Sequence, residues 1–171
     1  MAISQAMCTS FKRQILVGVH NLRPSGSGGN TFKIALYPSS ATYDANTTAY
    51  SATGEVTGTN YVAGGNTLSN TANNVTSANA VGYATFGNTT WATSTITARG
   101  AVIYNSTGLG RRSGTNLANS TDNDWISGAN ATSNNAAVCV LDFGSDKTTT
   151  AGDFTINFPT FGATTAIIRI A

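Results

Sequence analysis

Apolar and polar residues follow two different periods along this chain, and the change comes near residue 31. Over 9–20, apolar residues recur at helical spacing, and Thr9 or Ser10 can cap the start by accepting a backbone hydrogen bond. These apolar positions are Phe11, Ile15, Leu16 and Val19. The pattern predicts one short helix over 9–20, followed by a linker rich in Pro, Gly and Ser over 21–30.

From residue 31 onward, short stretches alternate with a period of two, as in strands with one buried face. Gly- and Asn-rich turns separate these stretches. The candidate strands lie at 31–37, 61–63, 67–69, 81–86, 91–99, 101–104, 136–143, 153–158 and 166–170, and 54–58 is a short strand or a turn. We therefore predict an all-β fold with a short N-terminal helix or arm. Its sheets form an antiparallel β-sandwich, jelly-roll or immunoglobulin-like, or a small barrel.

The 171 residues fit a single domain. We expect an N-terminal segment and linker over 1–30, and one β-sandwich domain over 31–171 that folds without that segment. The stretch 106–134 predicts a loop of unusual length for a compact domain. One interpretation is a surface loop pinned by Trp125 and Ile126. The other is a loop that faces a partner through Arg111, Arg112, Trp125 and Ile126.

Charge is scarce, since only 9% of residues are Asp, Glu, Lys or Arg, against about 25% in an ordinary soluble domain. A surface of hydroxyls and amides favours packing against other copies or a partner. The net charge is +2 and the basic residues are scattered, which argues against nucleic acid as a partner. The apolar runs are far shorter than the ~20 residues of a membrane-spanning helix, so we expect no membrane partner.

Candidate catalytic chemistry is equally sparse. His20 is the single histidine; without a visible nucleophile or second ligand, it indicates a helix C-terminal residue that contacts free carbonyls. Asp122 and Asp124 form a D-N-D triplet that lacks the downstream Gly and Glu of a calcium loop. We expect no catalytic residue, no metal and no cofactor, and we predict that the chain is not an enzyme.

The two cysteines, Cys8 and Cys139, lie far apart in the sequence. The N-terminus has no basic stretch followed by an apolar run, which indicates synthesis in a reducing cytoplasm. We expect free thiols, with Cys139 as a small apolar residue of the core.

Most of the chain outside 106–134 resembles a family of small β-rich structural proteins of tailed-bacteriophage virions. The segments that carry the resemblance are SFKR at 10–13, HNL at 20–22, TFKIALY at 31–37, TTAY at 47–50, GEV at 54–56, YVAGG at 61–65, TARGAVIYN at 97–105, VLDFG at 140–144 with DK at 146–147, DF at 153–154 and AIIRI at 166–170.

The resemblance implies a virion structural role without activity. The first expectation is a capsid decoration (cement) protein, a homotrimer on the capsid surface that binds the major capsid protein, made in the host cytoplasm. The segment set off by the linker is then the predicted capsid or subunit contact, through Phe11, Lys12, Arg13, Ile15 and Leu16. The alternative is a head fibre, tail or receptor-binding component.

A carbohydrate-binding sandwich is a further hypothesis. It would use Trp91, Trp125 and tyrosines as stacking platforms. It requires two or three coplanar aromatic rings on one exposed face, and Trp91 lies in a predicted strand where a core position is expected.

Overall fold

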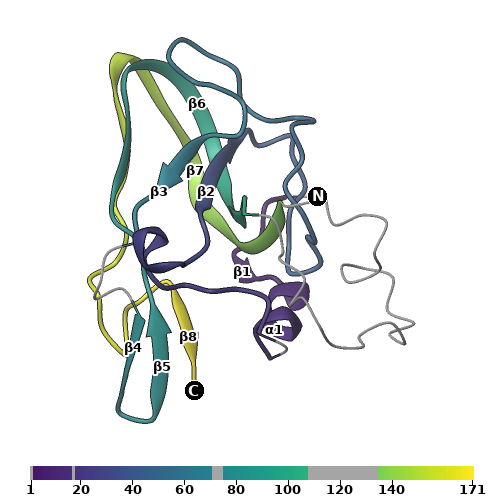
Figure 1. Cartoon of the computed structure of the whole chain (residues 1–171). Helices are drawn as coiled ribbons and strands as arrows, with labels where there is room; N and C mark the ends of the chain where they lie inside the picture. The colour runs from purple at the N-terminus through teal and green to yellow at the C-terminus, as the bar shows by residue number, and fades with distance from the viewer. Residues whose placement is uncertain (1, 17, 71–74, 108–134) are drawn as a thin grey trace.

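The computed structural model describes residues 2–16, 18–70, 75–107 and 135–171 (Figure 1). Its main sheet is antiparallel and has the strand order β1-β7-β6-β2-β3. These strands are β1 (Ala6–Met7), β2 (Phe32–Tyr37), β3 (Asn66–Leu68), β6 (Thr89–Asn105) and β7 (Ala136–Ile156). The alternation of Phe32, Ile34 and Leu36 predicted β2 correctly, and all three side chains are fully buried.

A smaller antiparallel sheet has the order β4-β5-β8 and lies below the main sheet in Figure 1. Its strands are β4 (Val75–Ala78), β5 (Val81–Ala84) and β8 (Ile168–Ile170). Asn79 and Ala80 join β4 to β5 with φ angles of 51° and 63°, as a tight hairpin turn requires at both central positions. The all-β prediction is confirmed: two antiparallel sheets with one short helix, and not a closed barrel.

β6 and β7 are longer than the sequence pattern predicts. The separate strands expected at 91–99 and 101–104 are one strand, and so are those expected at 136–143 and 153–158. Glycines that suggested breaks are absorbed as irregularities of the β6–β7 ladder, with register shifts on both sides of Ser94 and between Ala98 and Gly100. Thr93 and Ala151 have positive φ angles of 49°, and the paired strands curve strongly over their length (Figure 1).

The helix α1 (Thr9–Leu16) is shorter than the predicted 9–20. It ends because Gly18 takes a φ of 74° and the Val19 N–H bonds back to the Gln14 carbonyl, a common helix stop. A single 3-10 turn, η1 (Ser25–Ser27), interrupts the linker. No helix in the described part of the chain is long and apolar enough to cross a membrane.

The N-terminal segment contributes to the same core as the main sheet. Ile3, Cys8 and Phe11 are at most 4% exposed and belong to one cluster with the side chains of β2, β6 and β7. β1 pairs with β7, Ala6 opposite Val140 and Met7 opposite Cys139. Because these contacts supply core packing, we no longer expect residues 31–171 to fold well without the first thirty.

A carboxylate fixes the long connection between β2 and β3. Glu55 accepts hydrogen bonds from the hydroxyls of Tyr50 and Tyr61 and from the Gly64 N–H. Tyr104 of β6 donates to the Gly64 carbonyl at 2.7 Å. The segment 54–58, predicted as a short strand or turn, and the strand expected at 61–63 are both parts of this connection. The connection bonds to the neighbouring strands through isolated backbone hydrogen bonds, Val56 N–H to the Leu36 carbonyl and Thr95 N–H to the Thr59 carbonyl, rather than through a continuous ladder.

Candidate functional site

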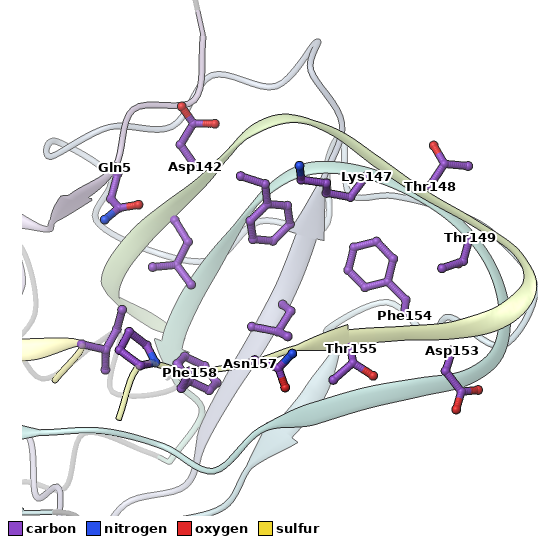
Figure 2. A pocket seen from close by; sticks show the side chains of 15 residues that line it. Gln5, Asp142, Lys147, Thr148, Thr149, Asp153, Phe154, Thr155, Asn157 and Phe158 are labelled. Atoms are coloured by element: carbon purple, nitrogen blue, oxygen red, sulfur yellow. The ribbon is translucent and has the colours of Figure 1, made fainter. Parts of the chain in front are cut away.

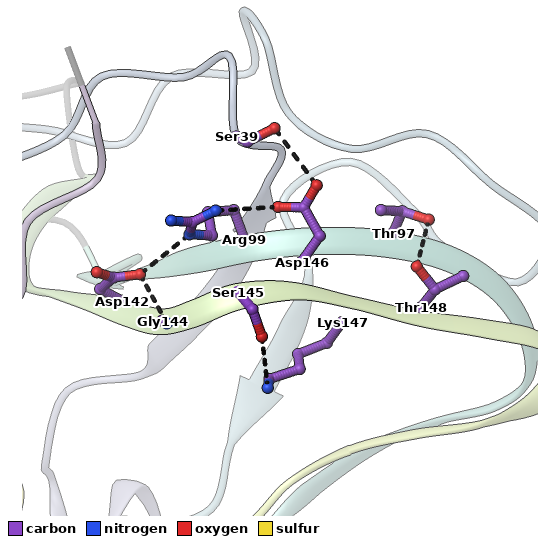
Figure 3. A network of polar contacts seen from close by, with 9 residues as sticks. All are labelled: Ser39, Thr97, Arg99, Asp142, Gly144, Ser145, Asp146, Lys147 and Thr148. Atoms are coloured by element: carbon purple, nitrogen blue, oxygen red, sulfur yellow. Dashed lines mark hydrogen bonds and ion pairs between the residues drawn. The ribbon is translucent and has the colours of Figure 1, made fainter.

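The β6–β7 ladder contains a large bulge, and an arginine bridges the bulge through two ion pairs. Ala98 pairs with Lys147 and Gly100 with Asp142, so Arg99 alone lies opposite residues 143–146. Its guanidinium reaches Asp142 and Asp146, both at 3.5 Å (Figure 3). Asp142 also accepts the Gly144 N–H, where φ is 74°. The bulge therefore has a defined shape, which fixes the direction of Phe143.

Beside this bulge lies an open groove of about 620 Å³, which we call the β7 groove. β7 arches around its side chains, with Gln5 near one end and Asp153 near the other (Figure 2). Its apolar lining consists of Leu141, Phe143, Phe154, Ile156, Phe158 and Ile167. A volume of this size is in the range of ligand and peptide sites, which combine an apolar floor with a few polar groups.

The charged groups of the β7 groove already have protein partners. Asp142 is paired with Arg99, the Asp153 carboxylate accepts the Thr93 N–H at 3.0 Å, and Lys147 donates to the Ser145 hydroxyl at 2.9 Å. The groove is thus a mainly apolar surface with a polar rim and no concentration of either charge.

A hydroxyl ladder covers the outer side of the same two strands. Thr90 bonds to Thr155 at 2.8 Å and Thr97 to Thr148 at 3.0 Å, all four side chains being exposed. Such cross-strand pairs stabilise an antiparallel sheet without charge. They are one reason why so few Lys and Glu residues appear on this surface.

A second hollow, of about 430 Å³, lies where the end of α1 and the turn after it meet the small sheet. We call it the α1–β8 hollow. Ile15, Val75, Tyr83 and Ile170 are among its lining residues, and Arg23 is its single charged one. Its lining residues Val75 and Ile170 are 45% and 51% exposed, and Leu16, which follows Ile15 in the chain but does not line the hollow, is 86% exposed. Exposed apolar side chains that gather in this way are typical of protein–protein contact sites.

His20 fixes the chain at the rim of this hollow. Its Nε2–H donates to Gln14 Oε1 at 2.6 Å, and its Nδ1 accepts from Asn105 Nδ2 at 3.0 Å. Its ring lies 4.8 Å from that of Phe11. Burial lowers the pKa of His20 to about 4, so the ring is neutral at pH 7. The expected role at helix carbonyls is wrong, because the helix ends earlier and the ring bonds to side chains of α1 and β6.

The residues of α1 that were predicted to contact the capsid or another subunit differ in their exposure. Phe11 is fully buried and is not accessible to a partner in this conformation. Ile15 and Arg13 are half-buried, whereas Lys12 and Leu16 are exposed. Capsid contact through this set stays a prediction, now limited to its accessible members. The other predicted partner residues, Arg111, Arg112, Trp125 and Ile126, lie outside the described residues.

The aromatic platform of a carbohydrate site does not form at the described position proposed for it. Trp91 is 4% exposed and packs between Tyr61 and Phe154, as expected of a core residue. In the β7 groove, the rings of Phe143 and Phe154 are tilted by 48° and Phe154 is buried. The rings that line the groove do not meet the requirement of coplanar exposed faces.

Both thiols are free and buried. Burial raises the pKa of Cys8 to about 12 and also raises that of Cys139, so neither is a nucleophile at neutral pH. The register places Cys139 opposite Met7 rather than opposite Cys8. Within the ranges that the structure describes, no three His, Cys, Asp or Glu side chains form a group that could hold a metal ion.

Sequence reasoning missed both hollows. Phe143 stands in an Asp-Phe-Gly triplet with no other kinase-like motif around it, and Val75 belongs to a strand that the pattern did not predict. The alternation of Phe154, Ile156 and Phe158 was a usable signal, but it indicated only that one strand face is apolar.

Comparison with known proteins adds no relative. No protein-family model matches the chain, and neither does any curated protein or solved structure.

Proposed function

We propose that this chain is a structural protein of a tailed-bacteriophage virion, a decoration protein that sits as a homotrimer on the capsid surface and stabilises the head by binding the major capsid protein. The observation that carries the proposal is the α1–β8 hollow with its exposed rim. Two of its lining residues, Val75 and Ile170, are exposed large apolar side chains, and a third such side chain, Leu16, directly follows the lining residue Ile15 in the chain. A rim of this kind favours a protein partner.

The charge around the hollow supports a partner of complementary character. Arg23 lines it, Lys12 and Arg13 lie on the adjoining helix, and Arg169 belongs to β8. The hollow itself has no acidic residue in its lining. An apolar contact with acidic residues at its border fits this surface best.

A binding role rather than a catalytic one is supported by the use of the ionisable groups. Glu55 fixes the β2–β3 connection, and Arg99, Asp142 and Asp146 close the bulge. Each of these groups has a structural task, and a rigid charge-poor β-scaffold is what a lattice component needs.

The proposal is tested by adding purified protein to expanded phage heads that lack it and measuring the copies bound per capsomer. We expect saturable binding at a fixed stoichiometry and greater resistance of the heads to heat. The double variant Leu16→Ser with Ile170→Ser should bind about tenfold more weakly, because apolar contacts at an interface centre carry most of its affinity.

Val62→Ser is the matched control, since Val62 is 76% exposed but lies in the β2–β3 connection rather than at the hollow. It should bind like the unchanged protein. Point substitutions are preferable to deletion of the N-terminal segment, because Ile3 and Phe11 are core residues. Binding to tails or host cells without binding to heads would favour the fibre, tail or receptor-binding alternative. No binding to any of them would refute a role on the virion surface.

A further inference from the structure

One edge of the main sheet is open beside the β7 groove. β1 covers β7 only at Cys139 and Val140. Beyond Val140, no strand in the part of the chain that the structure describes pairs with β7 on that side. The chain before β1 leaves the edge at Gln5, where Ser4 turns away to bond the Tyr43 carbonyl. Since Gln5 also lines the groove, the groove begins where the strand addition by β1 ends.

Part of this edge is blocked and part is accessible. The bulge at 143–146 and the positive φ of Ala151 interrupt it, which is how proteins commonly protect edges from unwanted pairing. From Phe154 to Ile156 the strand is regular again, because Trp91, Thr90 and Thr89 pair with these three residues in unbroken register. On its other side, next to the groove, no strand among the described residues pairs with this arm, so the backbone groups of alternate residues there have no strand partner in that part of the chain.

The side chains beside this arm determine the spacing of apolar residues that a bound strand would need. Phe154, Ile156 and Phe158 are spaced by two residues and line the groove together, and Phe143 faces Phe154 with ring centroids 6.4 Å apart. A strand added to the edge places every second side chain on the same face as these rings. Apolar side chains at alternate positions would therefore pack on the phenylalanines.

The charge distribution of the groove favours an uncharged binding partner. Asp142 is neutralised by Arg99, while Lys147 and Asp153 are of opposite sign and bonded to their own surroundings. A segment of high net charge would find no complementary charge in the groove and would gain no binding energy from one. The tilted, partly covered rings also suit branched aliphatic side chains better than the flat face of a sugar.

We propose that the 153–156 arm of β7 and the β7 groove bind an extended, uncharged peptide segment of a partner protein, with apolar side chains at alternate positions, by addition of a strand. Backbone hydrogen bonds supply affinity in this mode, and the pockets for alternate side chains supply specificity. This interface is separate from the α1–β8 hollow and does not depend on binding to heads.

The test is an NMR titration of the isotope-labelled full chain with the blocked peptide acetyl-Thr-Val-Thr-Val-Thr-Val-Thr-amide. We expect saturable shifts of the backbone amides over 153–156, with protection of these amides from hydrogen exchange. The control peptide carries proline in place of the central valine and cannot donate at that position, so its binding should be about tenfold weaker. Absence of saturable shifts with the alternating peptide, or equal binding of both peptides, would overturn the proposal.

Two variants separate the floor of the groove from its edge. Phe143→Ser removes a half-buried ring and should weaken peptide binding about tenfold; urea unfolding shows whether it is folded. Thr155→Lys changes an exposed side chain on the arm and places a charge of the kind that guards natural edges, so it should also abolish the shifts. Val62→Ser should bind normally. Peptide binding unaffected by Thr155→Lys, or maltoheptaose shifting the same amides as strongly as the peptide, would contradict strand addition.

Discussion

His20 makes the stability of the fold depend on pH in a way that can be calculated. The pKa of its ring is about 4 in the folded protein, against an ordinary value of about 6.5. As the pH falls below 6.5, the unfolded chain binds a proton at His20 and the folded chain does not. The stabilisation is therefore complete above pH 6.5 and is lost progressively as the pH falls toward 4.

One pKa unit corresponds to about 1.4 kcal/mol, so the full difference is at most about 3 kcal/mol. His20 is not completely buried, and contact with water reduces the effect. Between pH 7 and pH 4.5 we expect His20 to contribute a loss of roughly 2 kcal/mol in the free energy of unfolding. This is a large part of the 5–15 kcal/mol that is typical of a domain.

The experiment compares the unchanged protein with His20→Gln, in which an amide replaces the ring and can still bond to Gln14 and Asn105. Urea unfolding at pH 7, 5.5 and 4.5, followed by tryptophan fluorescence, gives the free energy of each protein. The variant should be less stable at pH 7, because it loses packing against Phe11, but should lose less stability on acidification. Both proteins contain the same carboxylates, so the difference between their losses of unfolding free energy on acidification reports the contribution of His20. Equal losses for the two proteins would refute the reasoning.

Other substitutions test the remaining structural assignments. Glu55→Gln should lower the free energy of unfolding by about 2 kcal/mol, because an amide cannot accept at both ends; an unchanged urea midpoint would contradict the network. Arg99→Ala should cost only about 1 kcal/mol, since both of its ion pairs are partly exposed, and a loss several times larger would show that the bulge needs the guanidinium. Gly65→Ala should yield little folded protein by circular dichroism, because φ is +64° and the new Cβ would lie 1.8 Å from a carbonyl oxygen of β2; a normal spectrum would rule out this turn. Cys8 and Cys139 should react with Ellman's reagent only in denaturant, and rapid reaction of the native protein would contradict their burial.

The sequence predicted those elements whose pattern of residues lies within a single stretch of the chain. Phe32, Ile34 and Leu36 alternate within one strand, and Trp91 is a large aromatic residue within a predicted strand, so both were assigned correctly. The tight turn at Asn79 carries no glycine, and β4 was missed for that reason. Nothing local shows that Arg99 lies opposite four residues of β7, because a bulge is a property of two strands and their register.

The candidate sites were still less predictable, for a related reason. The β7 groove combines Gln5 with residues of β7 and with Ile167, and the α1–β8 hollow combines the end of a helix with a sheet built from residues 75–84 and 168–170. His20 looked like a residue at a helix end because the pattern extended the helix to it. Its hydrogen-bond partners are the side chains of Gln14, in the helix, and of Asn105, at the far end of β6.

The pairing of β1 with β7 has a consequence for the time course of synthesis. Ala6 and its partner Val140 are 134 residues apart (140 − 6), so Ala6 leaves the ribosome well before Val140 is made. At ~5–20 residues per second, the first strand waits on the order of ten seconds for the second. Such distant pairings also fold slowly once the chain is complete. In that interval Ile3, Cys8 and Phe11 lack the β7 side chains with which they share a core, so the nascent chain carries these apolar side chains without their full packing.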